Sequence, residues 1–99
     1  MKNTQFQVAN SSDLPALVKE IGMPDPENAI TQLKELFDKG YIDQPRYEFL
    51  ESRSADGTAL WRKSCSVRGW GETQSGLYTQ KAPAKKDAAL KMLCRILQY

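Results

Sequence analysis

The sequence contains no histidine, only two cysteines and no long hydrophobic run. Without histidine the usual nucleophile–base pairs and metal clusters cannot be assembled, so we expect neither an enzyme nor a metal site, and no cofactor. Cys65 and Cys94 are isolated from each other, which favours reduced thiols over a disulfide. No apolar segment approaches the length of a membrane span, and the N-terminus lacks the hydrophobic core of a signal peptide. We therefore expect a cytoplasmic protein without membrane contact.

The 99 residues suffice for one small domain, and their charges are unevenly distributed. Residues 1–45 hold four Lys and Arg against seven Asp and Glu, residues 46–79 hold five against four, and residues 80–99 hold five against one. The overall net charge of +2 therefore conceals a strongly basic C-terminal segment. A basic segment of this kind indicates attraction to an anionic partner such as a phosphate backbone.

The most regular pattern lies in this C-terminal segment, where apolar residues at helical spacing predict one long helix. Its apolar stripe consists of Ala84, Ala88, Ala89, Met92, Leu93 and Ile96. The small alanine side chains predict that this helix approaches a sheet closely. Lys81, Lys85 and Lys86 lie at its start, where cations oppose the helix dipole and form, with the unpaired backbone N–H groups, a candidate anion site. Ordinary solvated lysines are the alternative explanation.

Two further helices are predicted upstream. A short one begins at Ser12 or Asp13 and ends at Gly22, and it must pack on the main domain or on a partner, or remain partly formed. A second helix opens at residues 25–27 and closes at Gly40. Its predicted buried face is Ala29, Ile30, Leu33, Leu36 and Phe37, and its exposed edge is Thr31, Lys34, Glu35 and Asp38. A solvated edge is the simplest interpretation of the last four.

Between the helices the pattern alternates and predicts three strands. The first follows Pro45 and ends at a turn over 54–58, the second spans 60–68, and a weaker third spans 72–78 with Leu77 as its main apolar residue. We therefore predict an α+β fold, in which a helix, a three-stranded antiparallel sheet and a second helix follow one another, with both helices on one face. Residues 1–25 would be a tail with the short accessory helix, and residues 26–99 the domain.

Residues 26–97 resemble the double-stranded-RNA-binding domain family. The segment 28–35 resembles the opening of that family's first helix, and Pro45-Arg46-Tyr47 resembles the start of its first strand. The pattern Lys81-x-x-Ala84-Lys85-x-x-Ala88-Ala89 resembles its KKxAKxxAA signature. A second register, with Lys85 and Lys86 as the paired lysines, is also open, although the first register also places Ala89 and Leu93.

The resemblance implies a non-enzymatic domain that binds duplex RNA by shape, across minor grooves and the phosphates between them. The implied RNA-binding residues are Thr31, Gln32, Glu35, Lys81, Lys85 and Lys86. Thr31 and Glu35 would meet 2′-hydroxyl groups, and Lys81 and Lys85 would meet phosphates. Lys86 would substitute for the family's middle lysine, which is Ala82 here.

Two departures from the family leave an alternative open. The loop between the first two strands is Ser54-Ala55-Asp56-Gly57 instead of the family's Gly-Pro-x-His, and one signature lysine is missing. The alternative is a protein–protein interaction or dimerisation module of the same fold, with weak or no RNA binding. Its partner would be another protein or another domain of a larger protein, and its anchor an exposed Trp70 or the helix near Leu14.

Overall fold

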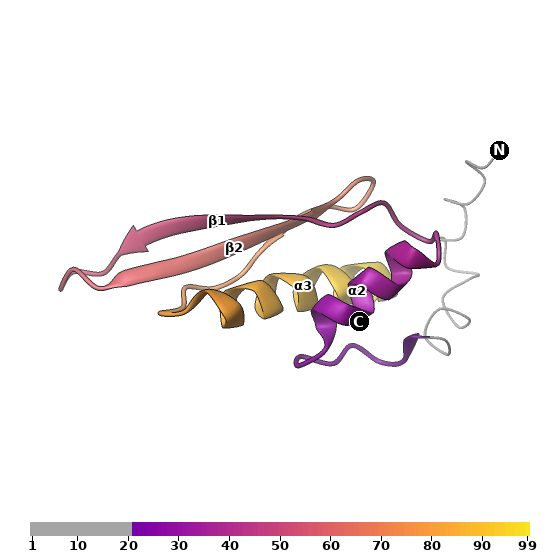
Figure 1. Cartoon of the computed structure of the whole chain (residues 1–99), viewed down its shortest axis with the longest axis horizontal. Coiled ribbons are helices and arrows are strands. Elements are labelled where there is room, and N and C mark those ends of the chain that lie inside the picture. The colour runs from indigo at the N-terminus through magenta and orange to yellow at the C-terminus, as the bar shows by residue number, and fades with distance from the viewer. Residues whose placement is uncertain (1–20) are drawn as a thin grey trace.

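A computed structural model describes residues 21–99 (Figure 1). In chain order the elements are α2 (Ala29–Asp38), β1 (Arg46–Arg53), β2 (Ala59–Val67), β3 (Gly71–Gln74) and α3 (Lys81–Leu97). Figure 1 shows both helices on the same side of the sheet, so the predicted α+β fold is confirmed. The predicted accessory helix lies outside the described residues except for its last two positions, and the division at residue 25 stays a prediction. No helix within residues 21–99 is long and apolar enough to cross a membrane.

The sheet is antiparallel with the order β1-β2-β3. Directly opposed residues point to the same face, and Tyr47 opposes Cys65, which is fully buried. Phe49 opposes Lys63 on that face. The predicted alternation of β1 is therefore correct, and its odd-numbered residues point toward the helices.

The predicted turn over 54–58 is confirmed, a second turn joins β2 to β3, and each uses a glycine with positive φ. Gly57 has a φ of 89° at the β1–β2 turn, and Gly69 has a φ of 86° at the β2–β3 turn. At the first turn the Ser54 N–H donates to the Thr58 carbonyl at 2.9 Å. These turns fix the register of the sheet, and in Figure 1 the β1–β2 hairpin extends past the start of α3.

The third strand is shorter than predicted, because it ends at Gln74 and not at Tyr78. The Gly76 N–H donates to the Asp87 carboxylate at 2.9 Å instead of to a strand partner, so the chain leaves the sheet here. Tyr78 then returns to form an isolated bridge with Trp61. Leu77, predicted to be the main apolar residue of this strand, lies in the segment that has left the sheet and is 49% exposed.

The apolar stripe of α3 forms the centre of the core. Each of its six predicted members is at most 1% exposed: Ala84, Ala88, Ala89, Met92, Leu93 and Ile96. The Thr73 hydroxyl of β3 donates to the Ala88 carbonyl at 2.9 Å, so the helix backbone lies directly against the sheet, as the small residues predict. Leu33 and Leu36 bring α2 onto the same core.

Two details of the predicted second helix are wrong. The helix begins at Ala29, because residues 25–28 form a separate turn in which the Asp25 carboxylate accepts the Glu27 N–H at 3.0 Å. Phe37 is 37% exposed, although it was assigned to the buried face. At 100° per residue, Gln32 and Phe37 lie on opposite sides of the buried centre of the helix face. The chain before the helix covers the side with Gln32, so the side with Phe37 remains exposed. The predicted end at Gly40 is correct.

Candidate nucleic-acid interface

Three lysines from two elements converge at the start of α3, on the helix-facing side of the β1–β2 hairpin. Lys81 is exposed and Lys85 is half-buried on the first turns of α3, and Lys63 of β2 is only 6% exposed. Among residues 21–99, none of these three forms an ion pair with a carboxylate. We call them the lysine cluster; it is a concentration of positive charge that the described part of the chain does not neutralise.

Aromatic rings hold the lysine cluster in place. The Lys81 Nζ lies 4.4 Å from the ring centroid of Trp61, and the Lys85 Nζ lies 4.7 Å from that of Tyr47. The Lys63 Nζ lies 3.1 Å from the centroid of the Phe49 ring. Cation–π contacts of this kind attract an ammonium group to the ring face. We call Tyr47, Phe49 and Trp61 the aromatic row.

The three rings belong to one continuous surface on the helix-facing side of the hairpin. Phe49 and Trp61 meet edge to face, with centroids 6.0 Å apart and an interplanar angle of 73°. Lys63 is also 5.7 Å from the Tyr47 centroid, and Lys81 is 5.3 Å from that of Phe49. Neighbouring lysines therefore share a ring, and the row determines how close their charges lie.

Burial around Lys63, Cys65 and Tyr47 disfavours the charged form of each side chain. Burial lowers the pKa of Lys63, and the charges of Lys85 and Lys81 lower it further. Burial raises the pKa of the Cys65 thiol to about 11, and it also raises the pKa of Tyr47. The positive charge of the lysine cluster is thus maintained against desolvation and mutual repulsion.

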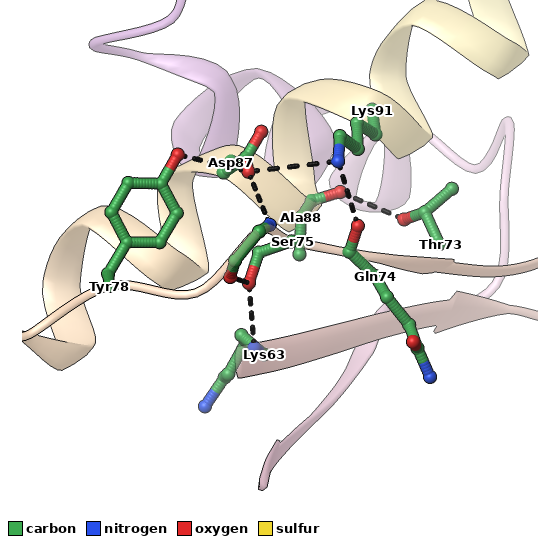
Figure 2. A network of polar contacts seen from close by, with 9 residues as sticks. Lys63, Thr73, Gln74, Ser75, Tyr78, Asp87, Ala88 and Lys91 are labelled. Carbon is green, nitrogen blue, oxygen red and sulfur yellow. Dashed lines mark hydrogen bonds and ion pairs between the residues drawn. The ribbon is translucent and has the colours of Figure 1, made fainter. Parts of the chain in front are cut away.

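A polar network centred on Asp87 positions the start of α3 (Figure 2). The Asp87 carboxylate accepts the Gly76 N–H at 2.9 Å and the Tyr78 hydroxyl at 3.0 Å. Lys91 lies 3.8 Å from the same carboxylate and donates to the Gln74 carbonyl at 3.0 Å. The hydrogen bond to Asp87 raises the pKa of Tyr78. The network ties the chain leading into α3 to the helix itself, and so sets where Lys81 emerges.

Ser75 connects this network to β2. Its hydroxyl oxygen accepts the Lys63 N–H at 2.9 Å and donates to the Gly76 carbonyl at 2.7 Å. In Figure 2 the Lys63 side chain points away from Asp87. The backbone of Lys63 is therefore fixed by the network, while its ammonium group lies apart from the nearby carboxylate.

Lys86 does not join the lysine cluster. Its Nζ donates to the Glu27 carboxylate at 2.8 Å, which places it beside the turn before α2 and neutralises its charge. Lys81 and Lys85 converge and Lys86 does not, which favours the first of the two registers for the signature motif. The substitution of Lys86 for the missing lysine at position 82 stays a prediction.

On α2 the predicted site residues divide into two groups. Thr31 and Glu35 are exposed, as predicted. Gln32 is 8% exposed; its side-chain amide accepts the Asp25 N–H at 2.9 Å and donates to the Met23 carbonyl at 2.9 Å. Gln32 thus fastens the preceding segment to the helix, and we leave it out of the interface.

The tip of the β1–β2 hairpin is closed on itself. The Asp56 carboxylate accepts the Ser54 hydroxyl and, at 3.0 Å, the Thr58 N–H. These hydrogen bonds lower the pKa of Asp56 to about 2. The tip therefore carries a persistent negative charge where the family's loop carries histidine.

Trp70 is not the exposed anchor that the alternative function requires. It is half-buried and packs against the core, and its carbonyl accepts a hydrogen bond from Arg95 at 2.9 Å. The predicted absence of a disulfide is consistent with the structure, in which Cys65 and Cys94 are free.

Sequence reasoning missed Lys63, Asp87 and the aromatic row. The signal for Lys63 was present, because the alternation of Trp61, Cys65 and Val67 already puts residue 63 on the buried face. A lysine at a buried strand position is unusual unless something holds its charge. Asp87 was the one acidic residue of the basic segment 80–99.

Comparison with known proteins supports the fold. No family model matches the sequence, and no solved structure matches it. The chain is 35% identical over 79 residues to ribonuclease 3 of Roseburia hominis, a match that covers 80% of this chain and 22% of that protein. It is also 35% identical over 69 residues to ribonuclease 3 of Treponema succinifaciens, covering 70% of this chain and 18% of that protein.

The chain thus spans about a fifth of the length of these relatives. The similarity is to the C-terminal region of ribonuclease 3, which is its double-stranded-RNA-binding domain, and the matched part does not include the nuclease domain. The order of helix, three strands and helix agrees with that assignment. By fold and by sequence similarity, the chain resembles the double-stranded-RNA-binding domain of ribonuclease 3.

Proposed function

We propose that this domain binds double-stranded RNA without cleaving it, with Lys81 and Lys85 on backbone phosphates and Thr31 and Glu35 in a minor groove. The observation that carries the proposal is the lysine cluster, whose charges have no carboxylate partner within residues 21–99. The start of a helix adds unpaired N–H groups to the same place, so a phosphate suits it both electrostatically and by hydrogen bonding. The similarity to ribonuclease 3 supports the same partner.

The exposed edge of α2 supplies the second part of the interface. The exposed Glu35 carboxylate can accept a hydrogen bond from a 2′-hydroxyl of RNA. DNA lacks this hydroxyl and so offers no such donor. Lys34 beside it is paired with Asp38 at 2.9 Å, so this edge brings little free positive charge. We therefore assign α2 to discrimination between RNA and DNA, and α3 to phosphate affinity.

A salt titration tests the proposal. If about three phosphates are neutralised, affinity for duplex RNA should fall about 40-fold between 50 and 200 mM salt. Lys85→Ala should weaken binding to all RNA duplexes alike and lower the salt slope by about one, because one phosphate contact is lost. Arg68→Ala is the matched control, since Arg68 is a cation on the β2–β3 turn, outside the lysine cluster. It should leave the slope nearly unchanged.

Glu35→Ala separates the two parts of the interface. It should narrow the preference for duplex RNA over duplex DNA and leave the salt slope nearly unchanged, because it removes an acceptor and no cation. Absence of duplex-RNA binding by the wild-type chain at 50 mM salt would reject the proposal. Wild-type behaviour of both Lys85→Ala and Glu35→Ala would reject the assigned contacts. Either result would favour the protein-interaction alternative.

A further inference from the structure

We propose that Lys63 is a third phosphate-binding residue, and that Lys63, Lys81 and Lys85 together bind one and the same phosphate of the RNA backbone. This inference rests on the proposed function and deepens it, because it adds a residue from the sheet to a contact otherwise made by α3. It also turns two separate lysine contacts into one site with three cations.

The first argument is the state of Lys63 itself. A lysine that is only 6% exposed normally has an anionic partner or loses its charge. Within the described chain, the contacts of the Lys63 Nζ are with the rings of Phe49 and Tyr47, and it joins neither an ion pair nor a hydrogen bond. An aromatic ring attracts the cation but contributes no negative charge to cancel it. The charge of Lys63 therefore remains available to an external anion.

The second argument is the arrangement of the three cations. Lys63 shares the Phe49 ring with Lys81 and the Tyr47 ring with Lys85, so it lies between them. The effect of both neighbours on the pKa of Lys63 agrees with this position. Three like charges this close repel one another, and one monoanionic phosphodiester group among them would be attracted to all three and offset much of that repulsion.

The third argument is the helix start that faces them. α3 is 17 residues long, and its N-cap residue, Gln80, makes no side-chain hydrogen bond to the first turn. The first backbone N–H groups of α3 thus have no side-chain cap and are oriented for an anion. A buried, unpaired cation and an uncapped helix start at the same place point to the same kind of ligand, a phosphate group.

The experiment measures binding to an RNA duplex of about 20 base pairs, long enough for one domain of this family. Lys63→Met removes the cation and keeps a long apolar side chain against the aromatic row. It should weaken binding about tenfold at 100 mM salt and lower the salt slope by about one. Lys63→Arg keeps the charge and should retain most of the affinity. Arg68→Met is the control that removes one cation from the β2–β3 turn, and it should bind nearly as wild type.

A double-mutant cycle tests whether the phosphate is shared. If Lys63 and Lys85 bind one phosphate, Lys63→Met combined with Lys85→Ala should weaken binding by clearly less than the product of the two single effects. Multiplicative effects would overturn the shared phosphate. Binding of Lys63→Met as tight as wild type, with an unchanged slope, would overturn the role of Lys63 even if Lys85→Ala weakens binding as proposed. Failure of the wild-type chain to bind duplex RNA would instead reject the proposed function itself, and this inference with it. Circular dichroism melting of each variant establishes that it is folded.

Discussion

Lys63 is a cation in a place where the fold favours a neutral group. Desolvation and the charges of Lys85 and Lys81 lower its pKa below the ordinary value. The folded protein therefore carries a free-energy penalty whenever Lys63 is protonated, because the unfolded chain binds that proton more readily. A charged residue that costs stability and has no anionic partner in the described chain is typical of a functional site.

The penalty predicts a pH-dependent effect of Lys63→Met on stability. Below the folded-state pKa of Lys63 the penalty is fully present, so the variant should be more stable than wild type at pH 7. As pH rises through that pKa toward about 10.4, the ordinary value for lysine, the folded wild type loses the proton and the penalty disappears. The advantage of the variant should therefore shrink between pH 7 and pH 10, as measured by urea unfolding at several pH values.

Comparing the two proteins at each pH isolates Lys63 from the other groups that titrate in this range. Cys65 and Tyr47, whose pKa values are raised by burial, are present in both proteins, so their contributions largely cancel in the difference. A variant that is less stable than wild type at pH 7, or an advantage that does not change with pH, would contradict the assignment of Lys63 as a destabilising buried cation.

At the scale of elements, α3 is the helix whose packing tolerates least change. Ala88 is fully buried, and its carbonyl accepts the Thr73 hydroxyl at 2.9 Å. Ala88→Leu would force the helix and β3 apart, so we expect a loss of about 1 to 3 kcal/mol in the free energy of unfolding. Ala82→Leu is the control, because Ala82 is exposed on the same helix. An unchanged melting temperature for Ala88→Leu would show that this face of α3 is not tightly packed.

The elements also show which parts of the fold can be predicted from sequence. The buried stripe of α3 was predicted except for Leu97, because a long helix repeats its apolar period many times and small residues mark a close approach. The end of β3 was not, since it depends on the Asp87 carboxylate taking the Gly76 N–H, a contact between residues eleven positions apart. The start of α2 was also predicted wrongly, in this case for a local reason: the Asp25 carboxylate accepts the Glu27 N–H and stabilises a turn before the helix.

The residues of the candidate site also differ in how far the sequence alone predicts them. The exposure of Thr31 and Glu35 on α2 could be predicted, and so could the place of Lys81 and Lys85 at the start of α3, because helical spacing relates the two residues of each pair without knowledge of the sheet. The cation–π contacts of Lys63 could not, since they depend on the strand register that brings Phe49 opposite it. The inward turn of Gln32 was also unpredictable from helical spacing, because the residues that cover it, Met23 and Asp25, precede the helix.

For the whole molecule, the boundary of the folded unit can be placed by the hydrogen bonds of Gln32. Its side chain donates to the carbonyls of Ile21, at 3.4 Å, and Met23, at 2.9 Å. We predict that a variant lacking residues 1–20 retains a cooperative thermal transition. A variant lacking residues 1–24 should be less stable by about 1 to 3 kcal/mol, because the buried amide of Gln32 loses its acceptors. Differential scanning calorimetry of the two truncations makes the comparison.

Loss of the cooperative transition on removing residues 1–20 would show that the folded unit needs the segment before Ile21. Equal stability of the two truncations would show that the contacts of Gln32 contribute little.

The way α2 is attached has a consequence for local opening. The strands are neighbours along the chain, and α3 packs on β2 and β3, whereas α2 packs mainly against α3. An element held by one neighbour can detach while the remainder stays folded, so its amide hydrogens should exchange with solvent at a lower opening free energy than those of β2 or α3. Because Thr31 and Glu35 lie on α2, the groups proposed to distinguish RNA from DNA are on an element that is held mainly by one neighbour. Part of the binding free energy would then be used to hold α2 in place, so the selectivity for RNA should decline on warming before the rest of the domain unfolds.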